Sequence, residues 1–376
     1  MSATRNLVHL SLPTTSYCGR TPLAAALVAI SLGLVVISGF AQDAENPWQP
    51  RLTLALADRS SSGGTNGGAT NAPKGEIDLN DPRVIAAISE AMDNPISELL
   101  AVWNQFDAIQ AHFPRTPFYD ERDLWAYRYQ FMPTIPVPLG ERWNWVSRLD
   151  LPVVSVPLKS EVGRLFQFDP GNNLLPDTAL PADLDPFGRT TGLGDIAYLG
   201  LVGPKHLPKV GEGKLFLAAG PTLIFPSASE DILGQGKWQA GPAFAAGFLT
   251  EHWRFGVFPQ QWWSFAGDEH RGAVSQMNLQ YFLYYAPTPE WEIGMSPNMF
   301  VNWNASSGNE VTFPVGLGVH HLFKIGKLPV SMGIEASYAV VHPSDLPGSR
   351  WDIRFTLMPL LPAPWGHLAR ELKALE

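Results

Sequence analysis

Cysteine and long apolar runs are almost missing from this chain. Its single cysteine, Cys18, lies near the N-terminus, so a mature chain without that segment could form no disulfide, cysteine metal site or cysteine nucleophile. No run of 18 apolar residues follows residue 41, which excludes membrane-spanning helices from the mature chain. Positive charge is also scarce: 26 Lys and Arg face 35 Asp and Glu, so nucleic acid is not an expected partner.

Tryptophan, by contrast, is abundant, with 13 residues, and two of them end a segment in which apolar and polar residues alternate. In WEIGMSPNMFVNW (291–303), alternate residues are apolar and run from Trp291 to Trp303, while the others are polar or small except Phe300. Such alternation predicts a strand, and Trp at both ends is typical of a strand that crosses a membrane. A half-buried strand of a secreted soluble sandwich would alternate in the same way.

The N-terminal segment has the features of a secretory signal. Arg5 and Arg20 precede or flank an apolar stretch at 23–37, and small residues lead to a predicted cleavage after Ala41. An uncleaved anchor helix is the alternative. Residues 42–80 are rich in Ser, Gly and Asn and predict a disordered linker. Residues 81–97 predict a short periplasmic helix and turn, with Asp81-Pro82 at its start and Asn94-Pro95 ending it.

The rest of the chain predicts an all-β fold, a transmembrane antiparallel barrel over residues 98–361. Alternation of apolar and polar residues gives twelve strands at 99–113, 124–131, 143–151, 193–202, 214–225, 238–249, 253–265, 274–285, 291–303, 311–323, 330–341 and 351–360. The first could equally be helical, but both barrel termini normally lie in the periplasm, which requires an even strand number. A long loop is expected at 155–191, and a tail with a short helix at 362–376.

Short and long connections alternate along these strands. Outer-membrane barrels keep short turns in the periplasm and longer loops outside, and this rule orients every strand. Trp143, Trp253 and Trp291 then lie at the periplasmic rim. The tryptophans expected at the outer rim are Trp125, Trp238, Trp262, Trp303 and Trp351. The prolines inside proposed strands each remove a ladder donor, and bulges are expected to accommodate some of them: Pro133, Pro152, Pro221, Pro242, Pro259, Pro297 and Pro314.

Several short segments in chain order resemble a known family. They are Asn94-Pro95-Ile96, Gly192-Leu193-Gly194-Asp195, Gly220-Pro221-Thr222, residues 233–238 (LGQGKW), residues 261–267 (QWWSFAG) and residues 313–318 (FPVGLG). Over roughly residues 92–360 the chain resembles the bacterial outer-membrane barrels grouped as the MetA-pathway of phenol degradation, also labelled neuromedin-U-like. The resemblance implies a porin-like transporter for hydrophobic or aromatic compounds in the outer membrane of a Gram-negative-type bacterium.

No motif predicts catalysis, a metal or a cofactor. Gly192-Leu193-Gly194-Asp195-Ile196-Ala197 matches a dinucleotide fingerprint on paper, but no strand precedes it and no helix follows. The inner face instead predicts a polar lumen lined by Arg128, Gln130, Asn144, Arg148, Asp150, Gln276, Asn278, Gln280, Glu292, Asn298, Asn302, Glu335, Asp352 and Arg354. Antiparallel pairing of the second and third strands is expected to bring Arg128 to Asp150.

These residues leave more than one function open. They could set what passes through a channel or transporter for small hydrophobic or aromatic solutes, with outer-membrane lipid around it. They could instead pair with one another and fill a small lumen, which would make a non-conducting structural or binding barrel. A lipid-hydrolysing barrel enzyme is a weaker alternative, because spacing alone cannot exclude a catalytic triad.

Overall fold

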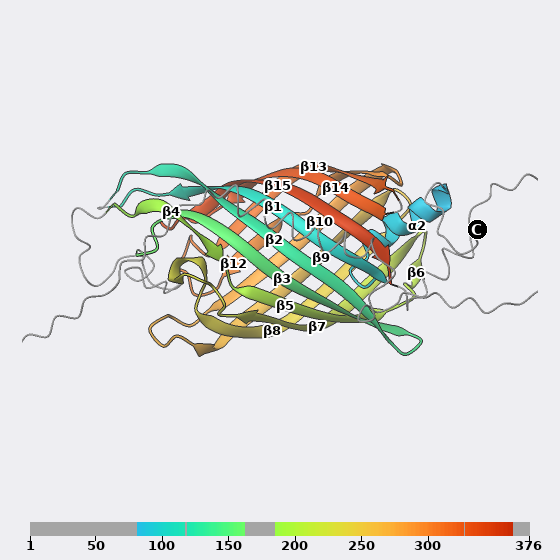
Figure 1. Cartoon of the computed structure of the whole chain (residues 1–376), viewed down its shortest axis with the longest axis horizontal. Helices are drawn as coiled ribbons and strands as arrows, with labels where there is room; N and C mark the ends of the chain where they lie inside the picture. The colour runs from blue at the N-terminus through green and yellow to red at the C-terminus, as the bar shows by residue number, and fades with distance from the viewer. Residues whose placement is uncertain (1–80, 117–118, 162–184, 327, 364–376) are drawn as a thin grey trace, which may run out of the picture. The chain divides into compact units, whose positions relative to one another are not determined.

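The computed structural model describes residues 81–116, 119–161, 185–326 and 328–363. The predicted signal segment and linker, and most of the tail, lie outside these residues. The described residues form one antiparallel sheet that closes on itself, because β9 pairs with β8 on one side and with β10 on the other (Figure 1). The strands are β1 (Leu99–Phe113), β2 (Arg122–Leu139), β3 (Trp143–Leu158), β4 (Phe187–Leu193), β5 (Ile196–Pro204), β6 (Lys209–Val210), β7 (Gly213–Phe225), β8 (Lys237–Leu249), β9 (Trp253–Gly267), β10 (Ser275–Thr288), β11 (Trp291–Met295), β12 (Asn298–Asn302), β13 (Val311–Ile325), β14 (Leu328–Val341) and β15 (Gly348–Pro362).

The closed wall has the predicted twelve strands. Within it β4 and β5 together make one wall strand, as do β11 and β12, and β6 forms a small hairpin with β7. The ambiguous segment 99–113 is a strand, and it closes the barrel by pairing with β15. The barrel cannot close without this strand. The requirement for an even number of strands therefore predicted it correctly, although the local periodicity of the segment was ambiguous.

The predicted boundaries were wrong at three places. β2 continues to Leu139, beyond its predicted end at residue 131. β3 continues to Leu158, and β4 pairs with it from residues that were assigned to the long loop. The segment 291–303 is interrupted at Ser296-Pro297, although its register with β10 is unbroken, since Leu283 pairs with Met295 and Leu279 with Met299. Pro297 has no backbone N–H to donate, so the ladder stops there without slipping.

Bulges accommodate only some of the in-strand prolines. Pro314 lies at a register shift between β13 and β14. Pro221 and Pro242 instead lie directly opposite each other in a regular stretch of β7 and β8. The glycines that precede them, Gly220 and Gly241, allow the neighbouring strand to approach: a Cβ added to either would lie within 2 Å of a carbonyl oxygen across the sheet. Close backbone approach at glycine thus replaces a bulge at these two prolines.

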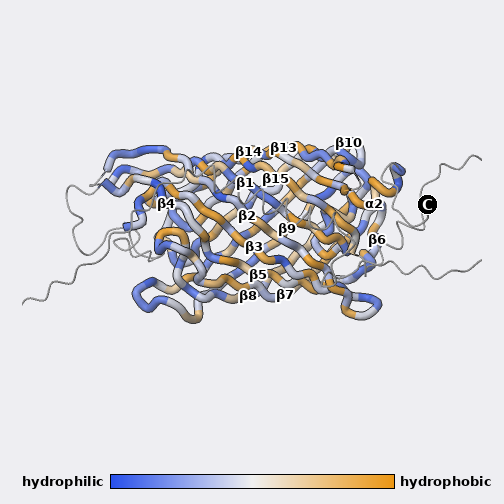
Figure 2. The backbone as a smooth tube through the Cα atoms, viewed as in Figure 1, coloured by the Kyte–Doolittle hydropathy of each residue, from blue (hydrophilic) through white to orange (hydrophobic). Residues whose placement is uncertain are grey.

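Apolar side chains cover the outer surface of the barrel. Tryptophans are exposed at the short-turn end, where the turns lie between β2 and β3, β8 and β9, and β10 and β11, and at the opposite long-loop end. One assignment was wrong: Trp262 is 6% exposed and faces inward, whereas Trp263 is 51% exposed and takes its place in the outer ring. Figure 2 shows hydrophilic loops gathered at the two ends of the strands. Among the described residues no helix is long and apolar enough to cross a membrane.

The helix α2 (Pro82–Met92) closes the short-turn end of the barrel (Figure 1). It begins and ends as the sequence predicts, with the Asp81 side chain accepting a hydrogen bond from the backbone N–H of Arg83. The prediction of a short periplasmic helix and turn did not include its packing against the barrel. Val84 and Ile88 are fully buried in a core with Leu322 and Leu360 of the barrel wall. We call α2 and the following residues up to Glu98 the plug.

Candidate functional site

None of the fourteen predicted lumen residues is exposed. The structure groups ten of them at three places. Seven belong to a charged network in the middle of the barrel: Arg128, Gln130, Asp150, Gln280, Glu335, Asp352 and Arg354. Asn144 and Glu292 contact or face the plug, and Gln276 joins a cluster of amides at the other end. Of the other four, Arg148 lines a cavity described below, and Asn302 accepts a hydrogen bond from the Asn304 N–H. Asn278 lies on β10 and Asn298 on β12.

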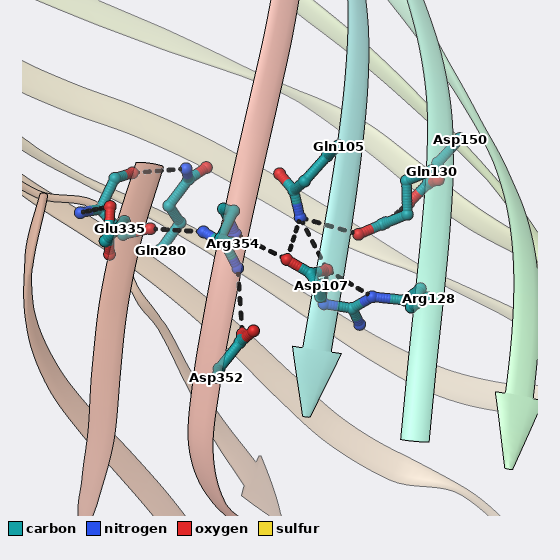
Figure 3. Close-up of polar contacts among 10 residues, drawn as sticks. Gln105, Asp107, Arg128, Gln130, Asp150, Gln280, Glu335, Asp352 and Arg354 are labelled. Atoms are coloured by element: carbon teal, nitrogen blue, oxygen red, sulfur yellow. Dashed lines mark hydrogen bonds and ion pairs between the residues drawn. The ribbon is translucent and has the colours of Figure 1, made fainter. Parts of the chain in front are cut away.

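Asp107 is the centre of the charged network (Figure 3). Arg354 Nε donates to its Oδ1 at 2.9 Å, and Arg128 donates to its Oδ2 from Nε at 2.9 Å and from Nη2 at 2.7 Å. Gln105 Nε2 donates to the same carboxylate at 3.0 Å and to Gln130 Oε1 at 3.0 Å. A fully buried carboxylate is therefore held by two guanidinium groups, an arrangement that offsets the cost of removing it from water.

The network also crosses the lumen to the interrupted strand β11–β12. Arg354 Nη1 donates to the carbonyl of Ser296 at 3.0 Å, and the Ser296 N–H donates to Glu335 Oε2 at 2.9 Å. Gln280 Nε2 donates to Ser296 Oγ at 2.8 Å, and Asp352 lies 3.5 Å from Arg354. The backbone polar groups that Pro297 leaves without ladder partners are thus satisfied by lumen side chains.

The expected pair between Arg128 and Asp150 is wrong. The register of β2 and β3 places Arg128 opposite Val154, so Asp150 lies further along the neighbouring strand. Arg128 turns to the other neighbour and pairs with Asp107, whereas Asp150 Oδ2 accepts a hydrogen bond from Gln130 at 2.6 Å.

A buried ionic group holds the plug in place. Arg254 on β9 contacts the carboxylate of Asp93, at the end of α2, and lies 3.3 Å from Glu292 on β11. Arg254 also donates to Ser89 Oγ at 3.0 Å. Burial raises the pKa of Asp93 well above its usual range, and the nearby Glu292 carboxylate raises it further, against the opposing effect of Arg254.

Further contacts tie the plug to the wall. Lys214 Nζ on β7 lies 2.5 Å from Glu90 Oε1 of α2, in a half-exposed ion pair. Asn144 Nδ2 on β3 donates to the backbone carbonyl of Ile96 at 3.2 Å. Ile96 itself is buried against Phe216 and other wall residues. The plug is therefore held by apolar packing, one buried ionic group and peripheral polar contacts.

A folded-in loop narrows the long-loop end. Asp195 accepts hydrogen bonds from the backbone N–H groups of Ala228 at 3.2 Å and Gln235 at 2.6 Å. This holds the 3-10 helix η1 (Asp231–Leu233), whose Ile232 and Leu233 pack against the inner face of β3. Beside it, mutually hydrogen-bonded amides form a cluster of Gln235, Gln239 and Gln276. The glycine-rich motif around Asp195 thus has a structural explanation.

A cavity of about 110 Å³ lies between the plug and the charged network. One part of its lining is apolar and largely aromatic: Met92, Trp103, Phe216, Phe258, Phe282, Tyr284 and Met358. The other part is polar and includes Arg148, Glu292, Glu335 and Arg354. Such a combination, a mostly apolar wall with a few polar groups, is typical of small-molecule sites.

Sequence reasoning missed several residues of this region. Asp107 lies on β1, where the competing helical interpretation obscured which residues face inward. Arg254 alternates with the exposed Trp253 and Phe255, so its position on the inner face was available from the period-two pattern. Asp93 had no such signal, because its partners lie about 160 and 200 residues further along the chain. Among the described residues no group of three or more His, Cys, Asp or Glu side chains is arranged to hold a metal.

Comparison with known proteins identifies similar folds and no family. No protein-family model matches the chain, and no curated protein matches it. An outer membrane channel from Pseudomonas putida F1 is 13% identical, with 70% of this chain and 94% of that chain covered and a TM-score of 0.48. The CymD monoaromatic hydrocarbon channel is 9% identical, with 73% and 93% covered and a TM-score of 0.33. Outer membrane phospholipase A from Escherichia coli is 13% identical, with 78% and 100% covered and a TM-score of 0.35. At these identities the likeness concerns the fold alone.

Proposed function

We propose that this chain is an outer-membrane barrel that passes small hydrophobic or aromatic compounds. The observation that supports this most strongly is the aromatic-lined cavity beneath the plug. Phe216 and Phe282 both line it and stack on each other, with their ring centroids 6.2 Å apart and their planes 5° apart. Apolar walls of this kind favour an uncharged ring or chain over water and ions.

The plug argues against a wide aqueous pore. Val84, Ile88 and Ile96 are buried where the lumen meets the short-turn end, and the Asp195-held loop narrows the other end. A solute must therefore displace part of one obstruction at each end. Such a path favours an apolar ligand, whose free energy falls when it leaves water for the cavity.

The outer surface supports a membrane location. Soluble monomers rarely expose large contiguous apolar patches, yet large apolar side chains on strand after strand of this barrel are exposed, with tryptophans near both rims. With the predicted secretory signal, this favours the outer membrane of a Gram-negative-type bacterium. We also propose that the chain belongs to the MetA-pathway and neuromedin-U-like group. The division into signal, linker, helix, barrel and tail is part of the same proposal.

A non-conducting structural barrel is the second candidate. The density of the Asp107 network favours it, because this carboxylate and the two guanidinium groups that hold it span three neighbouring strands, β15, β1 and β2. The cavity beside that network is what this candidate leaves unexplained.

Permeation of an uncharged aromatic dye separates the two candidates. Cells with a lipopolysaccharide-containing outer membrane exclude 1-N-phenylnaphthylamine, whose fluorescence rises when it reaches the inner leaflets. We expect cells that produce the barrel to take up the dye faster than cells without it. Phe282→Gln, which places an amide in the aromatic wall, should slow uptake, and Val210→Gln on the exposed hairpin should not. Equal uptake with and without the barrel would leave the structural candidate.

A further inference from the structure

Arg148 is the one arginine of the cavity lining that has no hydrogen-bond or ion-pair partner among the described residues. The other, Arg354, is held by Asp107 and Ser296. No carboxylate of the described chain lies within 4.0 Å of the Arg148 guanidinium, and its buried Nε donates no hydrogen bond. Leaving a buried donor unpaired costs free energy, and more when the donor is charged. This cation therefore has no counterion in direct contact, unlike most buried charges.

Nearby acids do not supply that counterion. Asp150, two residues along β3, accepts from Gln130. Glu335 accepts from the Ser296 N–H, and Glu292 is an ion-pair partner of Arg254. Asp150 Oδ1 has no hydrogen-bond partner among the described residues, and its charge acts on Arg148 without a hydrogen bond between them. The Arg148 Nε therefore remains an unused donor at the cavity.

Two aromatic rings flank the guanidinium. Its central carbon lies 5.8 Å from the ring centroid of Trp103 and 5.9 Å from that of Phe258. At such distances the ring faces attract a cation and hold it without neutralising its charge. A ligand that reaches Arg148 would thus have a guanidinium at one end and aromatic walls around its body.

We propose that Arg148 and the surrounding cavity bind a monocarboxylate with an aromatic body. The planar fork of a guanidinium matches a carboxylate in two parallel hydrogen bonds. Trp103, Phe216, Phe258 and Phe282 supply the apolar wall for the rest of the molecule. A single unpaired cation and several carboxylates in the same cavity select one negative charge over two. This inference names a substrate class for the proposed passage and rests on that function.

The test compares 4-phenylbutyrate with its uncharged amide, 4-phenylbutyramide. Binding of each is measured by calorimetry on the full mature chain in lipid nanodiscs. The intact protein should prefer the carboxylate by about tenfold or more, because a buried charge pair is expected to be lost with the amide. Arg148→Met should reduce carboxylate affinity to that of the amide, and Arg148→Lys should retain part of the preference. Arg142→Met, which removes a positive charge from an exposed turn, should behave as the unchanged protein.

Equal affinity of the intact protein for the two compounds would overturn the inference, as would carboxylate affinity unchanged in Arg148→Met. Heat-modifiable gel mobility reports whether each variant folds. If Arg148→Met does not fold, the intact protein and Arg148→Lys still decide. Binding needs no passage, and the dye of the permeation assay carries no carboxylate. Carboxylate preference without dye uptake would retain this site and reject the proposed function, whereas dye uptake without carboxylate preference would do the reverse.

Discussion

At the scale of single residues, Arg254 has the greatest influence on the plug. It is the cation shared by two buried carboxylates from different elements, Asp93 and Glu292. Arg254→Gln would leave both carboxylates without a counterion, which should weaken plug docking by about 3–5 kcal/mol. Hydrogen exchange of the amides in α2 measures this directly, and we expect much faster exchange in the variant.

Lys214→Gln is the matched control for that change. Lys214 also joins the barrel wall to α2, but its ion pair with Glu90 is about 39% exposed on both sides. Exposed pairs of this kind contribute about 0–1 kcal/mol. Equal acceleration of exchange in the two variants would show that the buried ionic group has no special role in docking.

Asp93 should make docking depend on pH. An acid whose pKa is raised by docking binds its proton more tightly in the docked state. Docking is therefore favoured most below the ordinary carboxyl pKa of about 3.9 and weakens as the pH rises toward the raised value. The measurement is the rate at which an Ala91→Cys variant reacts with a maleimide, divided by the rate for the exposed control Val210→Cys. We expect this reactivity ratio to be higher at about pH 8 than at about pH 5.

Asp93→Asn tests the cause, because its side chain cannot ionise. Added to Ala91→Cys, it should remove the pH dependence of the reactivity ratio. The introduced cysteine should be the only one in the mature chain, because Cys18 lies in the predicted signal segment. A ratio that still rises with pH in the Asp93→Asn background would assign the effect to another group.

Residue identities on the inner face were largely predictable, whereas their partners were not. A period of two places Arg128, Arg148 and Arg354 inside, and the structure agrees in keeping all three from the surface. Partners depend on register, which local alternation does not supply. The predicted partner of Arg128 was therefore Asp150, whereas in the structure it pairs with Asp107. That Arg148 has no ion-pair partner among the described residues was not predicted.

At the scale of elements, the strand pattern separates the lipid face from the lumen face. Ile334 lies in the middle of β14 and is 53% exposed, so Ile334→Arg should cost about 2–4 kcal/mol if a bilayer surrounds it. Asn298→Arg points to the lumen side of β12, as its ladder partner Gln280 does, and should cost far less. Denaturant-induced unfolding in lipid vesicles compares the two, and equal losses would contradict the face assignment.

Elements differ in how much their own sequence specifies. The N-cap at Asp81 and the stop at Asn94-Pro95 predicted α2 almost to the residue, because both signals are local. Its packing inside the barrel mouth was not predictable, since Leu322 and Leu360 lie far away in the chain. Val301 shows the same limit: it alternates with the lumen residues as a lipid-facing residue should, yet only 2% of it is exposed.

At the scale of the whole molecule, closure decided the architecture. Twelve strands follow from the even number that places both ends of a barrel on one side. What fills the barrel follows from contacts between strands that are distant in sequence, and these set the plug, the charged network and the cavity. The sequence therefore predicts the wall well and the contents poorly.

We expect the plug to be the main barrier to water and ions in the lumen. Planar-bilayer conductance of the mature chain, beside a variant that lacks residues 82–95, tests it most directly. We expect low conductance for the intact chain and a large increase for the deletion variant, with heat-modifiable mobility confirming that both barrels are folded. An intact chain that already conducts ions as well as the deletion variant would contradict the claim.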